Sequence, residues 1–287
     1  MTRKPSRTSL LCPNCRRLIS NDEPSCPYCG IRKPGSGLKN NAMVRGMSDP
    51  DLIFKVIIGI NVVMYVASLV VSVLRGESVG LTGNPLSFFS PSNETLLFLG
   101  ASGVAPINGL GYWWSLVAAN WLHGSILHIV FNMLAFRNLA PFVMREFGTY
   151  RLVIIFTLGG TLSYLVSYLA GVDLTIGASG AVCALVGAAL YFGKNRGGAY
   201  GNAVYRQVSG WVVSLALFGF IVPGINNWAH GGGIIAGAGL AWALGYLERK
   251  RESQRDKFLA LLCGSVTAVS ILLGIFTAAT TMHVHIR

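Results

Sequence analysis

The sequence predicts an all-α protein that crosses a membrane several times. Apolar residues make up 52% of the 287 residues and charged residues only 12%, about half of the ~25% that is usual for a soluble domain. After residue 50 the chain contains seven apolar runs, each close to the ~20 residues that a helix needs to cross a ~30 Å hydrocarbon core. The runs do not alternate as the strands of a membrane β-barrel do, so we expect helices throughout.

The apolar runs give the boundaries of the expected helices. They cover residues 53–74, 119–141, 149–170, 177–193, 204–222, 226–247 and 258–281. The 11 acidic residues all lie in tails, loops or at the edges of runs, as expected where a charge at the centre of the bilayer costs about 3 kcal/mol. The sequence therefore divides into a cytoplasmic module over residues 1–40, a linker over 41–52 and a transmembrane domain over 53–287.

Lysine and arginine predict the orientation of the chain. The tail before the first run carries Arg3, Lys4, Arg7, Arg16, Arg17, Arg32, Lys33, Lys39 and Arg45. Basic residues recur in every second connection, whereas the long segment 75–112 has only Arg75. The positive-inside rule then predicts a cytoplasmic N-terminus and a C-terminus outside. The net charge of +12 thus indicates topology rather than nucleic-acid binding, and we expect a multi-pass protein in contact with lipids of a bacterial-type plasma or inner membrane.

Two cysteine pairs predict a metal site in the N-terminal module. Cys12-Pro-Asn-Cys15 and Cys26-Pro-Tyr-Cys29 are two C-x-x-C knuckles with ten residues between them. This spacing is typical of a small zinc ribbon, in which four thiolates close a structural site. Iron is the competing metal, and a redox pair is the alternative without a metal. We assign the zinc no catalysis and expect the module to bind a cytoplasmic partner that the sequence does not identify.

Four polar residues within the apolar body are expected at a similar depth below the outer face. They are Ser179, His123, His128 and His230, each near the outer end of its run. One such residue is usually a hydrogen-bonding contact between helices, worth ~0.6 kcal/mol. A set at one depth instead favours a functional site, because ionisable groups inside a membrane are rarely retained without a role.

The residues around Ser179 favour a nucleophile. Gly177-Ala178-Ser179-Gly180 begins a predicted helix, whose free N–H groups would stabilise a developing oxyanion. The motif resembles the elbow of soluble hydrolases, but no convincing strand precedes it, and alone it is also common as helix packing. His128 and Asn132 are spaced i, i+4 and can donate hydrogen bonds from one helix face.

Small residues predict close packing between the Ser179 helix and the His230 helix. Gly233 and Gly237 follow His230 at a four-residue spacing, and Cys183 and Gly187 follow Ser179 at the same spacing. Helices approach closely along such faces, which would bring Ser179 and His230 within reach. Asp173, at the outer edge, is the acidic residue nearest this depth, so we expect a Ser–His dyad rather than a triad.

Together these motifs resemble those of the rhomboid intramembrane serine proteases over roughly residues 50–250. The motifs are His123-x4-His128-x3-Asn132, Gly-Ala-Ser179-Gly and Ala229-His230-x-Gly-Gly-x3-Gly237. The resemblance implies a Ser179/His230 dyad without a catalytic cofactor, an oxyanion held by His128 and Asn132, and a water-filled cavity that opens outward. It also implies a six-helix core with a seventh C-terminal helix, and single-span membrane proteins as substrates, cut near helix-destabilising residues.

Two positions depart from the family pattern. Where the family has Trp-Arg in the first outer loop, this chain has Trp114-Ser115, which bears on how that loop is anchored. One turn after the serine the family often has an aromatic residue that stacks on the histidine, and here it is Cys183. The alternative function is a non-catalytic membrane chaperone or quality-control factor of the same fold. A small-solute transporter is a weaker alternative, since no inverted repeat is visible.

Overall fold

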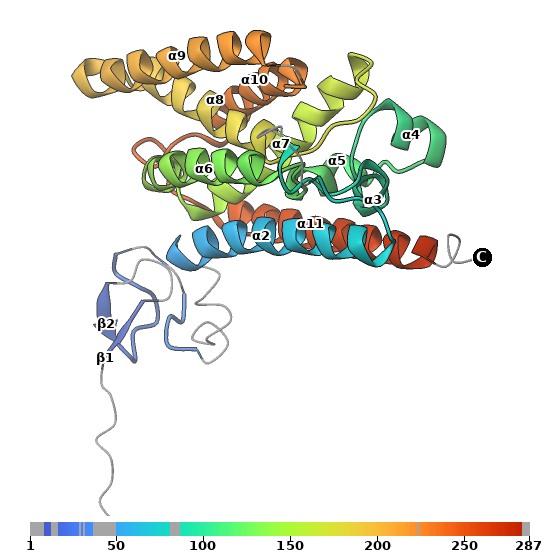
Figure 1. The fold of residues 1–287 in the computed structure, drawn as a ribbon. Coiled ribbons are helices and arrows are strands. Elements are labelled where there is room, and N and C mark those ends of the chain that lie inside the picture. The colour runs from blue at the N-terminus through green and yellow to red at the C-terminus, as the bar shows by residue number, and fades with distance from the viewer. Residues whose placement is uncertain are drawn as a thin grey trace, which may run out of the picture. The chain divides into compact units, whose positions relative to one another are not determined.

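The computed structural model describes residues 9–12, 17–28, 30, 32–36, 50–80, 87–222 and 224–282. The chain forms two compact units, residues 1–57 and 58–287. In the first, strands β1 (Ser9–Leu11) and β2 (Leu18–Ser20) pair as an antiparallel hairpin (Figure 1). Leu10 and Ile19 face each other in this hairpin and pack with the buried Cys12 and Cys26.

The second unit is helical, and a helix covers most of each of the seven predicted apolar runs. The helices are α2 (Pro50–Leu74), α3 (Asn93–Leu99), α4 (Val104–Leu110), α5 (Ser115–Ala118), the 3-10 helix η2 (Ala119–Trp121), α6 (Ile126–Phe147), α7 (Thr149–Leu169), α8 (Ser179–Arg196), α9 (Gly198–Ile221), α10 (Asn227–Leu244) and α11 (Gln254–Met282). Five of them, namely α2, α6, α7, α9 and α11, are long and apolar enough to cross a membrane.

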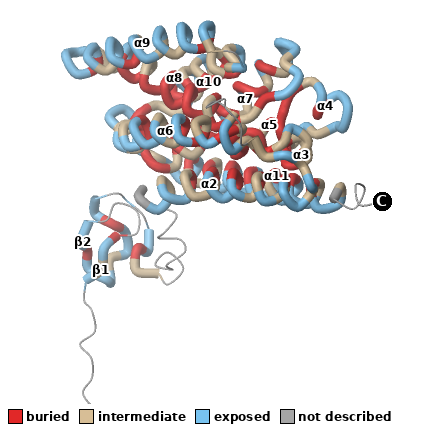
Figure 2. Tube along the Cα trace, in the orientation of Figure 1, coloured by how far each residue is buried: buried red, intermediate tan, exposed pale blue. Residues whose placement is uncertain are grey.

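Helices α8 and α10 pack against each other and are not among these five candidate spans of the described residues. Each has 18 residues, rich in glycine and alanine, so its hydropathy is modest. Most of α8 is buried against other helices (Figure 2), and α10 packs on it through glycine. A Cβ at Gly237 would collide with the carbonyl oxygen of Ala184, and one at Gly187 with that of Ile234. The predicted small-residue packing between these two helices is confirmed.

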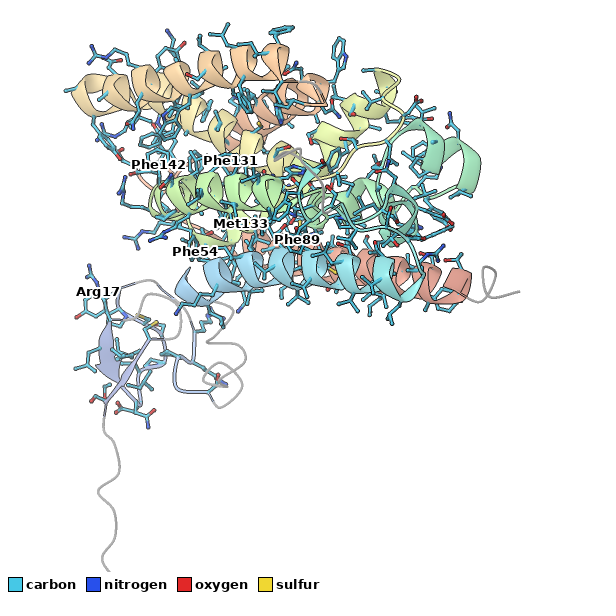
Figure 3. All side chains as sticks on the ribbon, in the orientation of Figure 1. Arg17, Phe54, Phe89, Phe131, Met133 and Phe142 are labelled. Carbon is cyan, nitrogen blue, oxygen red and sulfur yellow. The ribbon has the colours of Figure 1, made fainter. Side chains whose placement is uncertain are left out.

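Large apolar side chains point outward from several helices (Figure 3). Phe131 of α6 is 59% exposed, Phe220 of α9 is 82% exposed and Trp242 of α10 is 73% exposed. A soluble protein rarely leaves so much contiguous apolar surface in water, whereas lipid tails solvate it. The outward side chains and the apolar helices identify an integral, multi-pass membrane protein.

The start of the second predicted run was wrong. The run was expected to be helical from residue 119, with His123 in its first turns. Instead η2 ends at Trp121 and α6 begins at Ile126. The hydroxyl of Ser125 accepts a hydrogen bond from the N–H of His128 at 3.2 Å and so caps α6. Because a capping serine has extended backbone geometry, His123 lies in the loop before the helix.

A buried arginine fixes the connection between α10 and α11. The Arg151 side chain, in the first turn of α7, is fully buried. Its guanidinium donates to the carbonyl oxygens of Gly245, Lys250 and Arg251 at 2.7–3.0 Å and pairs with Asp256 of α11 at 3.2 Å. Truncating one partner of such a pair leaves a buried charge, which typically costs 3–5 kcal/mol. Helix α11 is thereby held against α7.

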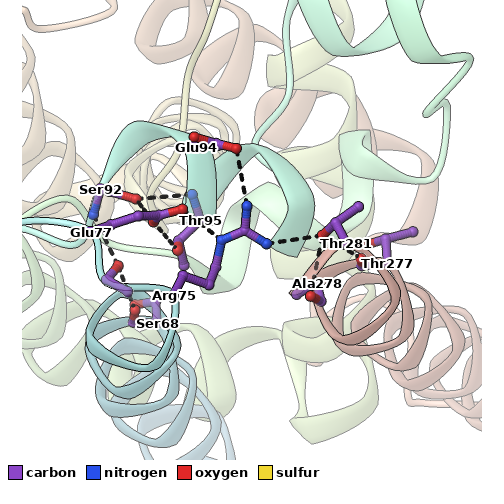
Figure 4. A network of polar contacts seen from close by, with 10 residues as sticks. Ser68, Arg75, Glu77, Ser92, Glu94, Thr95, Thr277, Ala278 and Thr281 are labelled. Atoms are coloured by element: carbon purple, nitrogen blue, oxygen red, sulfur yellow. Dashed lines mark hydrogen bonds and ion pairs between the residues drawn. The ribbon is translucent and has the colours of Figure 1, made fainter. Parts of the chain in front are cut away.

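A second polar network lies where α2 ends (Figure 4). The Arg75 side chain, 1% exposed, pairs with Glu77 at 2.5 Å and with Glu94 of α3 at 3.0 Å, and it donates to the hydroxyl of Thr281 in α11 at 3.0 Å. Glu77 in turn accepts from the hydroxyls of Ser92 and Thr95. The network therefore joins α2, α3 and α11.

Glu77 makes this network sensitive to pH. Burial alone would raise the pKa of Glu77, but hydrogen bonds from Arg75, Ser92 and Thr95 and the charge of Arg75 outweigh it and hold the pKa below its usual 4.5. A carboxylate with a lowered pKa stabilises the fold above the unfolded value, and that contribution is lost as the pH falls through the folded value. The stability that Glu77 adds is thus complete at neutral pH.

We therefore expect Glu77→Gln to lower the melting temperature at pH 7 and to reduce its fall between about pH 5 and pH 3. Thermal unfolding of the detergent-solubilised protein across this range measures both effects. Glu94→Gln is the matched control, because the Glu94 side chain is 42% exposed and exposed ion pairs add little. A Glu77→Gln variant with the acid sensitivity of the wild type would contradict this assignment.

Candidate active site

Ser179 is the first residue of α8, and its side chain is partly exposed. The N–H of Val182 donates to the carbonyl oxygen of Ala178 at 2.9 Å, which starts the helix. The first N–H groups of a helix have no partner within it and carry the positive end of its dipole. If the Ser179 hydroxyl attacked a carbonyl group, the negative charge that develops on the carbonyl oxygen would lie near this helix end.

Gly177 holds the turn that leads into Ser179. Its N–H donates to the carbonyl oxygen of Ala119 at 2.9 Å, and its carbonyl oxygen accepts from the buried Tyr164 hydroxyl. The φ angle of Gly177 is +119°, a conformation that residues with a side chain rarely adopt. The N–H and the carbonyl oxygen of Gly177 are thus both hydrogen-bonded, which fixes the path of the backbone that leads into Ser179.

His128 and Asn132 lie over the same turn. A Cβ at Gly177 would lie 2.5 Å from His128 Nε2 and 3.8 Å from Asn132 Nδ2. The N–H of Gly124 donates to His128 Nδ1 at 3.3 Å, so in the neutral imidazole Nε2 carries the proton. His128 therefore presents an N–H donor beside the start of α8. Asn132 donates to the carbonyl oxygen of His128 at 2.9 Å.

His230 is brought to this turn by the packing of α10 on α8. A Cβ at Gly180 would lie 3.9 Å from the carbonyl oxygen of Ala229, and one at Gly233 would collide with that of Gly180. The residues next to Ser179 and His230 therefore lie side by side. Nδ1 of His230 is buried without a hydrogen-bond partner in the described part of the chain.

Among the described residues, no hydrogen bond joins the Ser179 hydroxyl to His230. Hydrogen bonds of catalytic groups are often long in the absence of substrate and tighten only in the substrate complex. Asp173 lies exposed in the loop after α7, where its carbonyl oxygen accepts from the N–H of Ala105 at 3.2 Å. The arrangement places the helix turns of Ser179 and His230 next to each other, with the His128 ring beside the start of α8.

The remaining residues singled out in the sequence lie around this site. His123 is fully buried, its ring centroid 5.1 Å from that of His128. Cys183 is buried and faces Gly233 of α10. Ser115, which replaces the arginine of the family pattern, donates to the hydroxyl of Ser102 at 3.2 Å. The loop before α5 is thus anchored by a hydrogen bond between two buried serines.

The predicted zinc ligands lie in the first unit and are only partly described. Cys12 and Cys26 are 1% and 2% exposed and share one small core. The N–H of Gly30 donates to the carbonyl oxygen of Cys26 at 2.8 Å. This hydrogen bond joins the first residue of the second knuckle to the residue that follows the knuckle. Cys15 and Cys29 lie outside the described residues, so the four-cysteine site stays a prediction.

Sequence reasoning missed Tyr164 and Asn226. Tyr164 stood in an apolar run with no spacing that linked it to Ser179. Asn226 caps α10 through a hydrogen bond from the N–H of Ala229 at 3.0 Å, and the preference for asparagine at a helix start could have identified it. Its other contacts join segments that are distant in sequence.

Comparison with known proteins shows which proteins the chain resembles. Residues 110–247 match the Rhomboid domain, and this range contains His128, Asn132, Ser179 and His230. RHOMBOID-like protein 4 of Arabidopsis thaliana is 32% identical over 163 residues, which are 56% of this chain and 41% of that protein. Rhomboid protease GluP of Bacillus subtilis (strain 168) is 32% identical over 156 residues, which are 54% of this chain and 31% of that protein.

The similarity extends over part of each relative. RHOMBOID-like protein 6, mitochondrial, of Arabidopsis thaliana is 30% identical over 182 residues, 61% of this chain and 59% of that protein. The chain thus spans between about a third and three fifths of the lengths of these three relatives. The domain match and the relatives agree: residues 110–247, in a polytopic helical fold, are similar to the Rhomboid domain and to proteins that include a rhomboid protease.

Proposed function

We propose that the protein is an intramembrane serine endopeptidase that cuts single-span membrane proteins with Ser179 as nucleophile and His230 as general base. The observation that carries this proposal is the contact between α8 and α10 at Gly180 and Gly233. It brings the helix turns of both residues together beside the N–H donor of His128. No cofactor is needed for this chemistry.

The proposed reaction follows from the positions of the groups. The Ser179 hydroxyl attacks the scissile carbonyl while its proton passes to Nε2 of His230. The tetrahedral oxyanion accepts hydrogen bonds from His128 Nε2–H and from N–H groups at the start of α8. His230 then gives its proton to the leaving amine, and water hydrolyses the acyl-enzyme by the same steps. Since no buried carboxylate is described near His230, a dyad rather than a triad carries the proton.

Labelling with a fluorophosphonate tests this proposal. The purified wild-type protein should be modified at Ser179, because the probe reacts with serines that a neighbouring base activates. Peptide mapping identifies the labelled residue, and a reconstituted single-span substrate measures cleavage. A wild type that takes no label and cuts no such substrate would favour a non-catalytic membrane chaperone of the same fold.

We propose a cytoplasmic N-terminus and a C-terminus outside, in a plasma or inner membrane, on the basis of the basic connections. A cysteine introduced at one of two exposed positions, a glycine or an asparagine, tests this orientation. Gly109→Cys in α4 should react with a membrane-impermeant thiol reagent from outside, and Asn202→Cys in α9 only after the membrane is opened. Both positions are exposed. Equal labelling of the two from one side would contradict the proposed topology.

We further propose that Cys12, Cys15, Cys26 and Cys29 hold one structural zinc ion in a module that binds a cytoplasmic partner. The purified full-length chain should contain about one zinc per molecule, and Cys26→Ser should lose it and unfold the module, because such sites fold with their metal. Metal analysis and limited proteolysis measure the two effects. Fluorophosphonate labelling of Ser179 should persist in this variant. A metal-free wild type with a protease-resistant module would overturn the zinc site.

A further inference from the structure

Asn226 joins the start of α10 to the chain that leads into α8. Its Oδ1 caps α10 by accepting from the N–H of Ala229 at 3.0 Å, and its carbonyl oxygen accepts from the N–H of His230 at 3.1 Å. Its Nδ2 donates to the hydroxyls of Ser167 at 2.6 Å and Thr175 at 2.9 Å. One side chain therefore contacts three separate segments.

The two hydroxyl partners are themselves fixed. Ser167 is fully buried in the last turn of α7, and Thr175 is 8% exposed. Thr175 also pairs with Ser102 through two backbone hydrogen bonds, of 2.7 and 3.0 Å. Thr175 lies four residues before Ser179, and Asn226 lies four residues before His230. The amide bridge thus connects equivalent positions before the two proposed catalytic residues.

The bridge adds directional hydrogen bonds to the close packing of α8 on α10. At Gly187, Gly233 and Gly237 the helices meet through glycines and backbone carbonyl oxygens, which permit close approach but do not interlock as large side chains do. Among the described residues, Ser179 and His230 are not hydrogen-bonded to each other. A directional hydrogen bond in a low-dielectric interior is strong enough to fix one alignment.

We propose that Asn226 is a positioning residue that sets the register of His230 against Ser179 through its bridge to Ser167 and Thr175. The inference rests on the proposed function of these two residues. It predicts that loss of the bridge, with the helix cap kept, slows the chemical step without weakening substrate binding. A displacement of about 1 Å in a catalytic group can reduce the rate about 10²-fold.

Asn226→Ser separates the two roles, because serine caps a helix as well as asparagine does but is too short to bridge. We expect it to melt close to the wild type and to have an unchanged KM, while kcat and the rate of fluorophosphonate labelling fall about 10-fold to 10²-fold. Asn226→Asp keeps the cap, and the Ser167 and Thr175 hydroxyls can turn to donate to its carboxylate. This conservative variant should restore most of the rate.

The other end of the bridge supplies matched controls. Thr175→Val removes the acceptor at nearly constant shape and should slow the reaction as Asn226→Ser does, whereas Thr175→Ser keeps the hydroxyl and should not. The double variant Asn226→Ser/Thr175→Val should be no slower than either single variant, because both remove one interaction. If rates instead follow melting temperature across the set, Asn226 acts only as a cap and the inference is wrong.

The two proposals fail in different ways. If the wild type cuts and labels and Asn226→Ser does so equally fast, the inference is wrong and the proposed function stands. If the wild type does neither, the proposed function is wrong, and the ring signals of His230 in histidine-labelled protein then test the bridge by NMR. Asn226→Ser should move these signals and Thr175→Ser should not. Unchanged signals in Asn226→Ser would overturn the inference.

Discussion

Ser179→Ala and His230→Ala are each expected to abolish cleavage of a reconstituted single-span substrate while the protein stays folded. A serine hydroxyl is too weakly acidic to attack without a base, and α10 brings His230 to the turn that starts α8. In enzymes where a serine and a base act as one unit, removal of either lowers kcat by about 10⁴-fold or more. Cleavage assays and melting temperatures of the purified variants measure the two halves of this expectation.

The oxyanion variants should differ from the dyad variants. His128→Ala removes one N–H donor beside Gly177, and the loss of one such donor typically costs about 10²–10³ in rate. Asn132→Ala should be no more severe, because Asn132 donates within its own helix to the carbonyl oxygen of His128. Residual cleavage is therefore expected in both variants.

Asp173→Asn is the control for the absence of a third catalytic residue. Asp173 lies exposed in the loop after α7, so its charge is screened by water, and the variant should cut at a rate near that of the wild type. A variant as inactive as Ser179→Ala would show that a carboxylate takes part, and the dyad mechanism would then be wrong.

The features that sequence alone predicted are those that depend on composition and periodicity. Apolar runs located the helices, because a segment inside a bilayer must satisfy its own backbone. The four-residue spacing of Gly233 and Gly237 predicted the face along which α10 meets α8, and the structure confirms it. Both patterns are local, so they can be seen without knowing which segments become neighbours.

The features that sequence reasoning missed depend on contacts between distant segments. The irregular segment that contains His123 ends at the capping Ser125, although the apolar run in the sequence extends through this segment. The contacts of Tyr164 with Gly177, and of Asn226 with Ser167 and Thr175, join residues 13, 59 and 51 positions apart. No periodicity marks such pairs, because each arises only after the helices have packed.

The contact between α8 and α10 gives the second prediction of large effect. A Cβ at Gly237 would collide with the backbone carbonyl of Ala184, and a backbone atom cannot turn away as the end of a flexible side chain can. We therefore expect Gly237→Val to push the helices apart, lower stability by about 1–3 kcal/mol or more, and remove most fluorophosphonate labelling although Ser179 and His230 are intact.

Gly239, two residues further along the same helix, is the matched control for this substitution. It is exposed, and a Cβ there would meet nothing within 4 Å, so Gly239→Ala should keep full labelling and gain up to about 1 kcal/mol from its higher helix propensity. Gly237→Ala should fall between Gly237→Val and the wild type, since its methyl group meets the same carbonyl with less bulk. If Gly237→Val melts and labels as Gly239→Ala does, close approach of the two helices is not what brings His230 to Ser179.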